Sequence, residues 1–225
     1  MASTVRRPLG PVDLWQGGAE GGAVYLSTQL PLDRFPIAPP PGPPATNLTY
    51  YSAWSNTSGT TPATNLQASI ARGQVIFETF PIPSGDPNAT VFCAACHAQR
   101  GGGEHVLAAE QINNGVGGNS VALNGPAPDP TLPIFKLTCT PGAAVGLDGA
   151  VVTTNDPGLA LITGRCRDIG AFTVPSIRGL AARAPYFHDG SAATVMDVVN
   201  FYDKRFSIGF TDQQKQDLVN FLLAL

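Results

Sequence analysis

Two cysteines and a histidine stand close enough together in the sequence to hold one prosthetic group. They form the run Cys93-Ala94-Ala95-Cys96-His97, which is the C-x-x-C-H motif of c-type haem attachment. Two thiols one helical turn apart can reach the two vinyl groups on one edge of the macrocycle, and the imidazole that follows comes up beneath the iron. The small residues Ala94 and Ala95 let the porphyrin lie close to the backbone. The sequence therefore predicts one covalently bound haem c, with His97 as the proximal iron ligand.

The same motif also occurs in zinc sites and in redox-active proteins, and both alternatives fit this sequence less well. A tetrahedral zinc site needs a second closely spaced pair of ligands, whereas Cys139 and Cys166 are far apart and His105 and His188 are isolated. A thioredoxin-like motif needs alternating strands and helices, which the sequence lacks. The distant pair Cys139 and Cys166 is most simply explained as a structural disulfide.

A six-coordinate haem needs a second axial ligand. The sequence offers Tyr202, Met196, His188 and His105, and an open site is the remaining alternative. A single apolar stripe at helical spacing consists of Val195, Val198, Val199 and Tyr202. Met196 falls about 100° from the leading edge of this stripe, so we expect Tyr202 to face inward and Met196 to face away. An anionic tyrosinate would lower the reduction potential and a methionine would raise it. A core tyrosine with a hydrogen-bonded hydroxyl is the alternative explanation of Tyr202.

The first part of the chain differs in composition from the rest. Residues 31–62 are rich in Pro, Thr, Ser, Asn and Gly, and the run at 38–44 favours extended polyproline geometry. We therefore expect residues 1–65 to form an N-terminal arm or linker and residues 66–225 to form the haem domain. The aromatic residues Tyr50, Tyr51 and Trp54 could anchor the arm, although a solvated linker fits the composition equally well.

Three helices are expected to build the haem domain. The first covers about 66–80, where Gly73 indicates close packing. The second starts at the cap Thr194 and runs to about Asp203, and the third follows a capping box at Thr211. The apolar stripe of the third helix consists of Leu218, Phe221, Leu222 and Leu225. Between 101 and 170 we expect long irregular loops and a small β-hairpin at 134–137. The fold class is thus mainly α, of the cytochrome c-like type.

The last third of the chain resembles a known family. The segments that carry the resemblance are F-T-V-P-S-I-R-G-L at 172–180 and A-P-Y-F-H-D-G-S at 184–191, followed by Ala193-Thr194 and the two closing helices. They resemble the C-terminal haem domain of bacterial di-haem cytochrome c peroxidases and their methylamine-utilisation (MauG-type) relatives, over about 66–225. Family peroxidases carry two C-x-x-C-H motifs, whereas this chain has one, and residues 1–65 contain no cysteine or histidine.

The resemblance has consequences for three residues of the expected site. It implies that Tyr202 occupies the position of the sixth iron ligand, and it supports a bidentate pairing of Arg178 with a haem propionate. His188 is expected to hold its loop against the haem by hydrogen bonds rather than to bind iron. We expect His105, which follows three glycines, to be exposed.

Charge and hydropathy limit the functions that the chain can have. With 16 acidic and 13 basic residues and a net charge of -3, the sequence has no electrostatic footprint for nucleic acid. No apolar run reaches the length of a membrane span, and the start lacks a secretory signal, so we expect Met1 to begin a fragment of an exported chain.

We expect a periplasmic or extracellular domain that transfers single electrons to a redox partner protein. One alternative is a peroxidase-like reaction with hydrogen peroxide, in which Tyr202 or His188 would act on the distal side. Another is a haem-stabilised structural module that joins a larger assembly through the arm.

Overall fold

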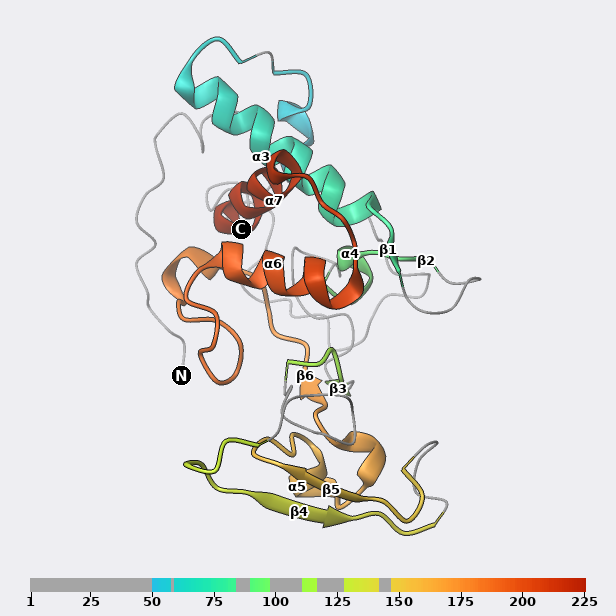
Figure 1. Ribbon diagram of the computed structural model, residues 1–225. Helices are drawn as coiled ribbons and strands as arrows, with labels where there is room; N and C mark the ends of the chain where they lie inside the picture. The colour runs from blue at the N-terminus through green and yellow to red at the C-terminus, as the bar shows by residue number, and fades with distance from the viewer. Residues whose placement is uncertain (1–49, 58, 84–89, 98–110, 117–127, 142–146) are drawn as a thin grey trace, which may run out of the picture. The chain divides into compact units, whose positions relative to one another are not determined.

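The computed structural model describes residues 50–57, 59–83, 90–97, 111–116, 128–141 and 147–225. The helices are α3 (Pro62–Thr79), α4 (Cys93–His97), α5 (Ala160–Thr163), α6 (Val195–Phe206) and α7 (Asp212–Ala224), with 3-10 turns η1 (Ser52–Trp54), η3 (Cys166–Asp168) and η4 (Leu180–Ala182) (Figure 1). The strands are β1 (Ile82–Pro83), β2 (Thr90–Val91), β3 (Gln111–Ile112), β4 (Phe135–Thr138), β5 (Val151–Thr154) and β6 (Phe172–Thr173). The described residues hold more helix than strand, which confirms the mainly α prediction.

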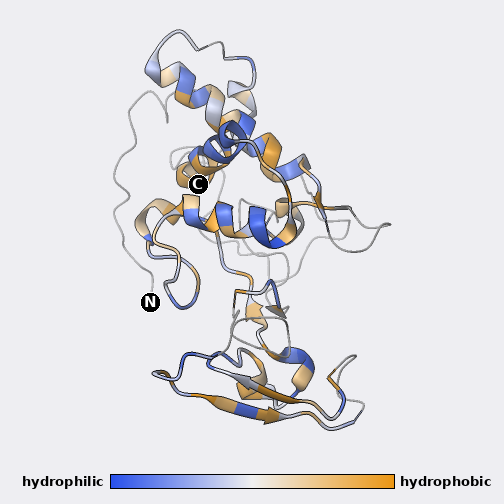
Figure 2. Cartoon of the chain, in the orientation of Figure 1, coloured by the Kyte–Doolittle hydropathy of each residue, from blue (hydrophilic) through white to orange (hydrophobic). Residues whose placement is uncertain are grey.

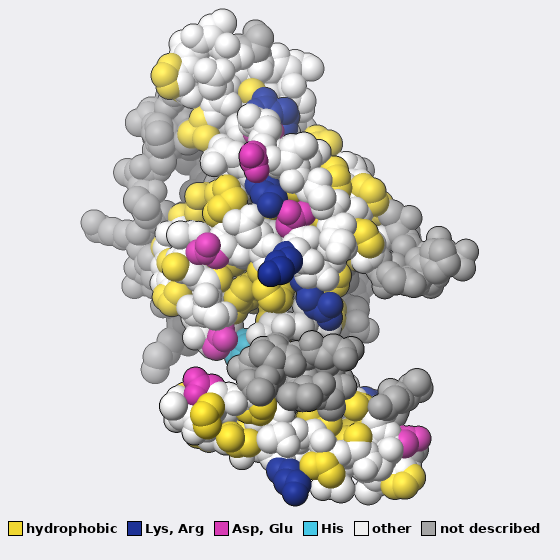
Figure 3. Space-filling model, viewed as in Figure 1, with side chains coloured by type: hydrophobic (Ala, Val, Ile, Leu, Met, Phe, Trp, Pro, Cys, Tyr) yellow, Lys and Arg dark blue, Asp and Glu magenta, His cyan; other side chains and the backbone are white. Residues whose placement is uncertain are grey.

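The chain divides into two compact units, which are described separately. Of the described residues, one unit combines those between 50 and 97 with 175–225, and the other consists of those between 111 and 174. We refer to the first as the helical unit, because it contains α3, α4, α6 and α7, and to the second as the disulfide unit, because it contains Cys139 and Cys166. On the face of the helical unit drawn in Figure 3, basic and acidic side chains are interspersed, in keeping with the small net charge of -3.

Helix α3 begins earlier than the apolar spacing alone predicted. It starts at Pro62 rather than near 66, because the Thr61 hydroxyl accepts a hydrogen bond from the Thr64 backbone N–H and caps the first turn. Proline suits this first helical position, since its fixed φ matches the helix and its missing N–H has no helical partner there. The capping signal therefore lies several residues before the first apolar residue of the stripe.

Both closing helices begin at the predicted caps. Thr211 and Gln214 form the predicted capping box, with the Thr211 hydroxyl accepting from the Gln214 N–H at 3.2 Å. Helix α6 likewise starts after its cap Thr194, but it continues to Phe206, beyond the predicted end near 203. The Asp203 carboxylate accepts backbone N–H groups from the turn that follows, at 2.8 and 3.0 Å, and so supports the connection into α7.

The core of the helical unit lies where α3 crosses α7 (Figure 1). In Figure 2, hydrophobic and hydrophilic residues alternate along α3 and α6, as expected for helices with one buried side. The predicted stripe of α7 is buried in full: Leu218, Phe221, Leu222 and Leu225. Gly73 is buried at the crossing, and a Cβ atom there would lie 2.0 Å from the Asp217 carbonyl oxygen. The prediction that Gly73 marks close packing is confirmed.

The buried carboxylate of Asp217 on α7 forms hydrogen bonds with side chains of α3 where the two helices cross. Its oxygens accept hydrogen bonds from the Ser69 hydroxyl at 2.6 Å, the Arg72 guanidinium at 2.8 Å and the Gln213 amide at 2.9 Å. Burial alone raises the pKa of Asp217, but these hydrogen bonds outweigh burial and hold the pKa below its ordinary value. The charged form of Asp217 therefore stabilises the folded state.

Replacing Asp217 with asparagine is expected to lower the free energy of unfolding by about 2 kcal/mol at neutral pH, because charged hydrogen bonds to a buried acceptor are lost. The folded pKa lies below the unfolded one, so this stabilisation is present above about pH 4 and is lost as the pH falls through the folded pKa. Urea unfolding should thus show a difference between variant and wild type that shrinks toward about pH 3. The exposed Asp212→Asn on the same helix is the control. A difference that does not change with pH would contradict the proposed role of the charge.

The aromatic end of the expected arm packs onto the helical core. Tyr51 and Trp54 are each 3% exposed, and their rings stack at a centroid distance of 5.0 Å. The Tyr51 ring also meets Phe221 edge-on at 6.0 Å, and its backbone N–H donates to the Gln74 side chain at 2.8 Å. The sequence left open whether these aromatic residues anchor the arm or belong to a solvated linker. In the structure, Tyr51 and Trp54 are anchored on the helical core. The rest of the arm, residues 1–49, lies outside the described residues.

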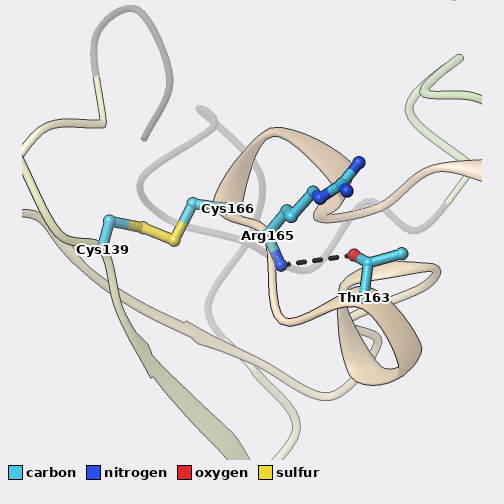
Figure 4. The surroundings of a disulfide bond; sticks show 4 residues. All are labelled: Cys139, Thr163, Arg165 and Cys166. Atoms are coloured by element: carbon cyan, nitrogen blue, oxygen red, sulfur yellow. Dashed lines mark hydrogen bonds between the residues drawn. A yellow bond between two sulfur atoms is a disulfide. The ribbon is translucent and has the colours of Figure 1, made fainter. Parts of the chain in front are cut away.

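The disulfide unit has a small core of its own. Strands β4 and β5 pair antiparallel, with Leu137 opposite Val152, which confirms the predicted hairpin. The buried core consists of Cys139, Leu147, Val152, Ala160, Cys166 and Ile169. The sulfur atoms of Cys139 and Cys166 lie 2.04 Å apart, at disulfide distance (Figure 4). Such a bond helps a unit with so few buried apolar side chains to hold its shape.

Candidate haem site

The single turn α4 carries all three residues of the predicted attachment motif. Cys93, Cys96 and His97 are half-buried, because α4 packs against α3. Ala94, on the same turn, is 2% exposed and belongs to the hydrophobic cluster that contains Phe77 of α3. The ring centroids of His97 and Phe77 are 6.2 Å apart, and the Nδ1 atom of His97 is buried. All three side chains thus come from one turn, and this turn packs against the core through Ala94.

The burial of Cys93 bears on the alternative of a redox-active C-x-x-C. Burial raises the pKa of the Cys93 thiol to about 12. A redox-active C-x-x-C needs the opposite shift, because its thiolate has to form near neutral pH. Among the described residues, no group of three or more His, Cys, Asp or Glu side chains is placed to hold a metal ion such as zinc. Two thiols and one imidazole from a single turn are the set of side chains that a haem with two thioethers and an axial histidine requires.

Met196 lies differently from what its helical phase suggested. It is half-buried and packs against the hydrophobic cluster that also contacts Cys93. The expectation that Met196 faces away from the core is therefore wrong. With about 100° per residue, Met196 lies only about 60° from the buried Val199, so the stripe of α6 is wide enough to include it. Both residues predicted as candidates for the sixth ligand, Met196 and Tyr202, are thus half-buried on α6.

Tyr202 belongs to a cluster of aromatic rings. Its ring is parallel to that of Phe206 at 6.1 Å and meets Phe201 edge-on at 5.3 Å. A third ring, that of Phe187, contacts Tyr202 at 6.2 Å and Phe201 at 5.0 Å. Phe187 has a φ of 65°, which is unusual for a bulky residue and costs conformational energy. Sequence reasoning missed Phe187, because nothing in the A-P-Y-F-H-D-G run shows that its phenylalanine has a positive φ.

The chain is similar in sequence to two groups of curated proteins. It is 37% identical over 89 residues to the cytochrome-c peroxidase IdrP1 of Denitromonas iodatirespirans, and the match covers 35% of this chain and 24% of that protein. It is 32% identical over 161 residues to the hydrazine synthase subunit gamma of Kuenenia stuttgartiensis, covering 68% of this chain and 40% of that protein. The chain therefore spans less than half the length of these relatives. No family model matches the chain.

Arg178 and His188 lie in the two segments, 172–180 and 184–191, that carry the resemblance to the peroxidase family. Arg178 is half-buried, and its backbone N–H donates to the Ser176 hydroxyl at 3.3 Å. His188 is exposed, next to Asp189. Burial raises the pKa of Asp189, but hydrogen bonds from Ser191 and the charge of His188 together lower it below the ordinary value. The roles assigned to Arg178 and His188 stay predictions, and His105 lies outside the described residues.

Proposed function

We propose that the chain is a c-type cytochrome domain that binds one haem covalently and transfers single electrons. Cys93 and Cys96 would form the two thioethers, and His97 would be the proximal ligand. The observation that carries the proposal is the half-buried turn α4, which holds all three donors and packs against α3. When bound, the haem supplies an iron that changes between the ferric and the ferrous state.

The residues around α4 prepare the imidazole for this role. Ala94 and Phe77 are almost fully buried and exclude water from the core side of the turn. The burial of Nδ1 leaves Nε2 as the ring nitrogen of His97 that would face an iron. Such burial also lowers the local dielectric, and haem potentials depend on burial and on axial ligation. The domain would thus fix the orientation and the surroundings of its proximal ligand.

The proposal includes Tyr202 as the sixth ligand, with Met196 as the alternative. The resemblance to the methylamine-utilisation enzymes supports Tyr202, and the aromatic rings of Phe187 and Phe206 restrain its ring. The half-buried position of Met196 on the same helix supports the alternative. Because a phenolate stabilises ferric iron and a thioether stabilises ferrous iron, the identity of the ligand sets whether the reduction potential of the haem is low or high.

Replacing Tyr202 with phenylalanine is expected to change the ferric absorption spectrum and to raise the reduction potential by at least about 100 mV, because an anionic ligand of ferric iron is lost. Met196→Leu on the same helix is the matched variant and should leave both properties unchanged. Spectra of the haem-loaded wild-type chain and both variants, with a redox titration of each, measure the effect. A change confined to Met196→Leu would assign the ligand to Met196 instead.

The second candidate function is a peroxidase reaction, favoured by the similarity to proteins named cytochrome-c peroxidases. Such a reaction needs an axial position that opens to hydrogen peroxide and a distal acid or base. Tyr202 and His188 are the side chains proposed for these tasks. Adding peroxide to the same ferric samples separates the two functions. A stable spectrum supports electron transfer, and rapid conversion supports the peroxidase.

We further propose that the chain works outside the cytoplasm, in the periplasm or at the cell exterior, with a redox partner protein. Thioether attachment of haem and the disulfide geometry of Cys139 and Cys166 both suit an oxidising compartment. None of the described helices is long and apolar enough to cross a bilayer.

A further inference from the structure

A polar hollow lies beside the disulfide of the second unit. It has a volume of about 380 Å³, and the residues that line it are Thr138, Thr140, Gly164, Arg165, Cys166 and Arg167. Two of these residues are cationic and two carry hydroxyl groups, and none of the described lining residues is acidic. A hollow lined by donors and positive charge suits an anion.

The disulfide brings the lining residues together from two distant segments. Thr138 and Thr140 flank Cys139, and Arg165 and Arg167 flank Cys166. The Cα atoms of the two cysteines are 5.7 Å apart, so the four flanking residues meet around one short bridge. The cysteines themselves are buried, at 1% and 7% exposure, whereas all four flanking residues are exposed. The disulfide that joins the two segments is thus buried, and the threonine and arginine residues beside it are exposed to solvent.

Asp168, which follows Arg167 in the sequence, forms only a long ion pair with it. One oxygen of Asp168 accepts from the Thr163 hydroxyl at 2.7 Å, and the other lies 3.8 Å from Nε of Arg167, too far for a hydrogen bond. The Thr163 hydroxyl oxygen also accepts a hydrogen bond from the backbone N–H of Arg165 at 3.2 Å (Figure 4). This bond restrains the backbone where the segment 165–167 begins. A guanidinium group has five N–H donors, so one long ion pair does not saturate Arg167.

We propose that this hollow is a binding site for a small tetrahedral oxyanion of the phosphate or sulfate class. The guanidinium groups of Arg165 and Arg167 supply paired N–H donors that match two oxygens of such an ion, and the hydroxyls of Thr138 and Thr140 supply further donors. The site belongs to the disulfide unit alone and involves none of the residues assigned to the haem. Its test therefore does not depend on the proposed electron transfer.

Calorimetric titration of the haem-loaded chain with sodium phosphate, at an ionic strength held constant with chloride, tests the site. We expect saturable binding of one phosphate per chain, weakened at least about tenfold in Arg165→Gln and in Arg167→Gln, since each removes a charged pair of donors. Lys136→Gln is the matched control, because Lys136 is an exposed cation on β4 that does not line the hollow. Sulfate should compete with phosphate at the same site.

A second measurement uses the unaltered protein. Phenylglyoxal modifies accessible arginines, and phosphate should slow its reaction with Arg165 and Arg167, as followed by peptide mass spectrometry, while the exposed Arg183 reacts at the same rate. Equal heats for wild type, both arginine variants and the Lys136 variant would overturn the proposal. Equal protection by chloride and by phosphate at the same ionic strength would also overturn it, because the arginines would then respond to ionic strength alone.

Discussion

A chain in which serine replaces both Cys93 and Cys96 is expected to carry no covalently bound haem. Serine keeps the size and helical position of each cysteine, but its hydroxyl does not form the thioether that joins a thiol to a haem vinyl group. The wild-type chain, matured in a host that attaches c-type haem, should keep its haem after denaturation. Haem staining of a denaturing gel and the intact mass measure this difference, which we expect to be complete.

The chain contains its own matched control for this experiment. Cys139 and Cys166 lie at disulfide distance in the disulfide unit, away from the motif in sequence. Replacing these two cysteines with serine should leave the covalent haem in place, and it should reduce the stability of the disulfide unit by about 3 kcal/mol. Covalent haem in the Cys93 and Cys96 double variant, or its absence from the wild-type chain, would contradict the proposed attachment. Loss of haem from both double variants would point to failed folding instead.

The features that the sequence predicted well depend on near neighbours in the chain. The capping box of Thr211 and the stripe of α7 use residues within two helical turns, and the structure contains both. The start of α3 depends on the same kind of signal, but Thr61 and Pro62 stand before the apolar residues that were used to find the helix. Local signals of this kind reveal helices even where boundaries shift by several residues.

The part of the candidate site whose residues are neighbours in the sequence could be predicted in the same way. Cys93, Cys96 and His97 fall within one helical turn, so their shared position on α4 follows from spacing alone. The opposite side of the site depends on tertiary packing. Helical phase ranked Tyr202 above Met196, yet the width of the buried stripe is set by neighbouring elements, and both residues are half-buried. A helical wheel gives the angle of each residue around the helix, but not which neighbouring elements cover that residue.

The disulfide unit shows a different limit. Its residues contain many glycines and prolines and only short apolar runs, which predicted loops and one hairpin. The structure gathers these runs into a separate core around Val152, Cys139 and Cys166. The pairing of Cys139 with Cys166 was predicted from the cysteine count, but the hollow beside them depends on which residues the two distant segments bring together. The oxyanion site proposed above was therefore not visible before the fold was known.

Replacing Gly73 with alanine is expected to lower the free energy of unfolding by about 3 kcal/mol, although alanine is the better helix former by about 1 kcal/mol. The added Cβ would lie 2.0 Å from the carbonyl oxygen of Asp217 and 2.7 Å from Cβ of Phe221. The first of these atoms is backbone, so relief requires that α3 and α7 move apart. That movement would lengthen the 2.6 Å hydrogen bond between Ser69 and Asp217 and loosen the packing of Phe221.

Urea unfolding of the haem-loaded chain, followed by circular dichroism, measures the cost of the alanine. Val75→Ala is the matched control, because Val75 is 51% exposed on the same helix and its replacement should change the free energy by less than about 0.5 kcal/mol. If Gly73→Ala proves as stable as the wild type, helix propensity outweighs the contact and the two helices are less tightly packed than the structure indicates. If the expected loss is found, the contact between α3 and α7 depends on the missing side chain of Gly73. The turn α4 rests on α3 through Ala94 and Phe77, so the same contact would then support the proposed haem ligand.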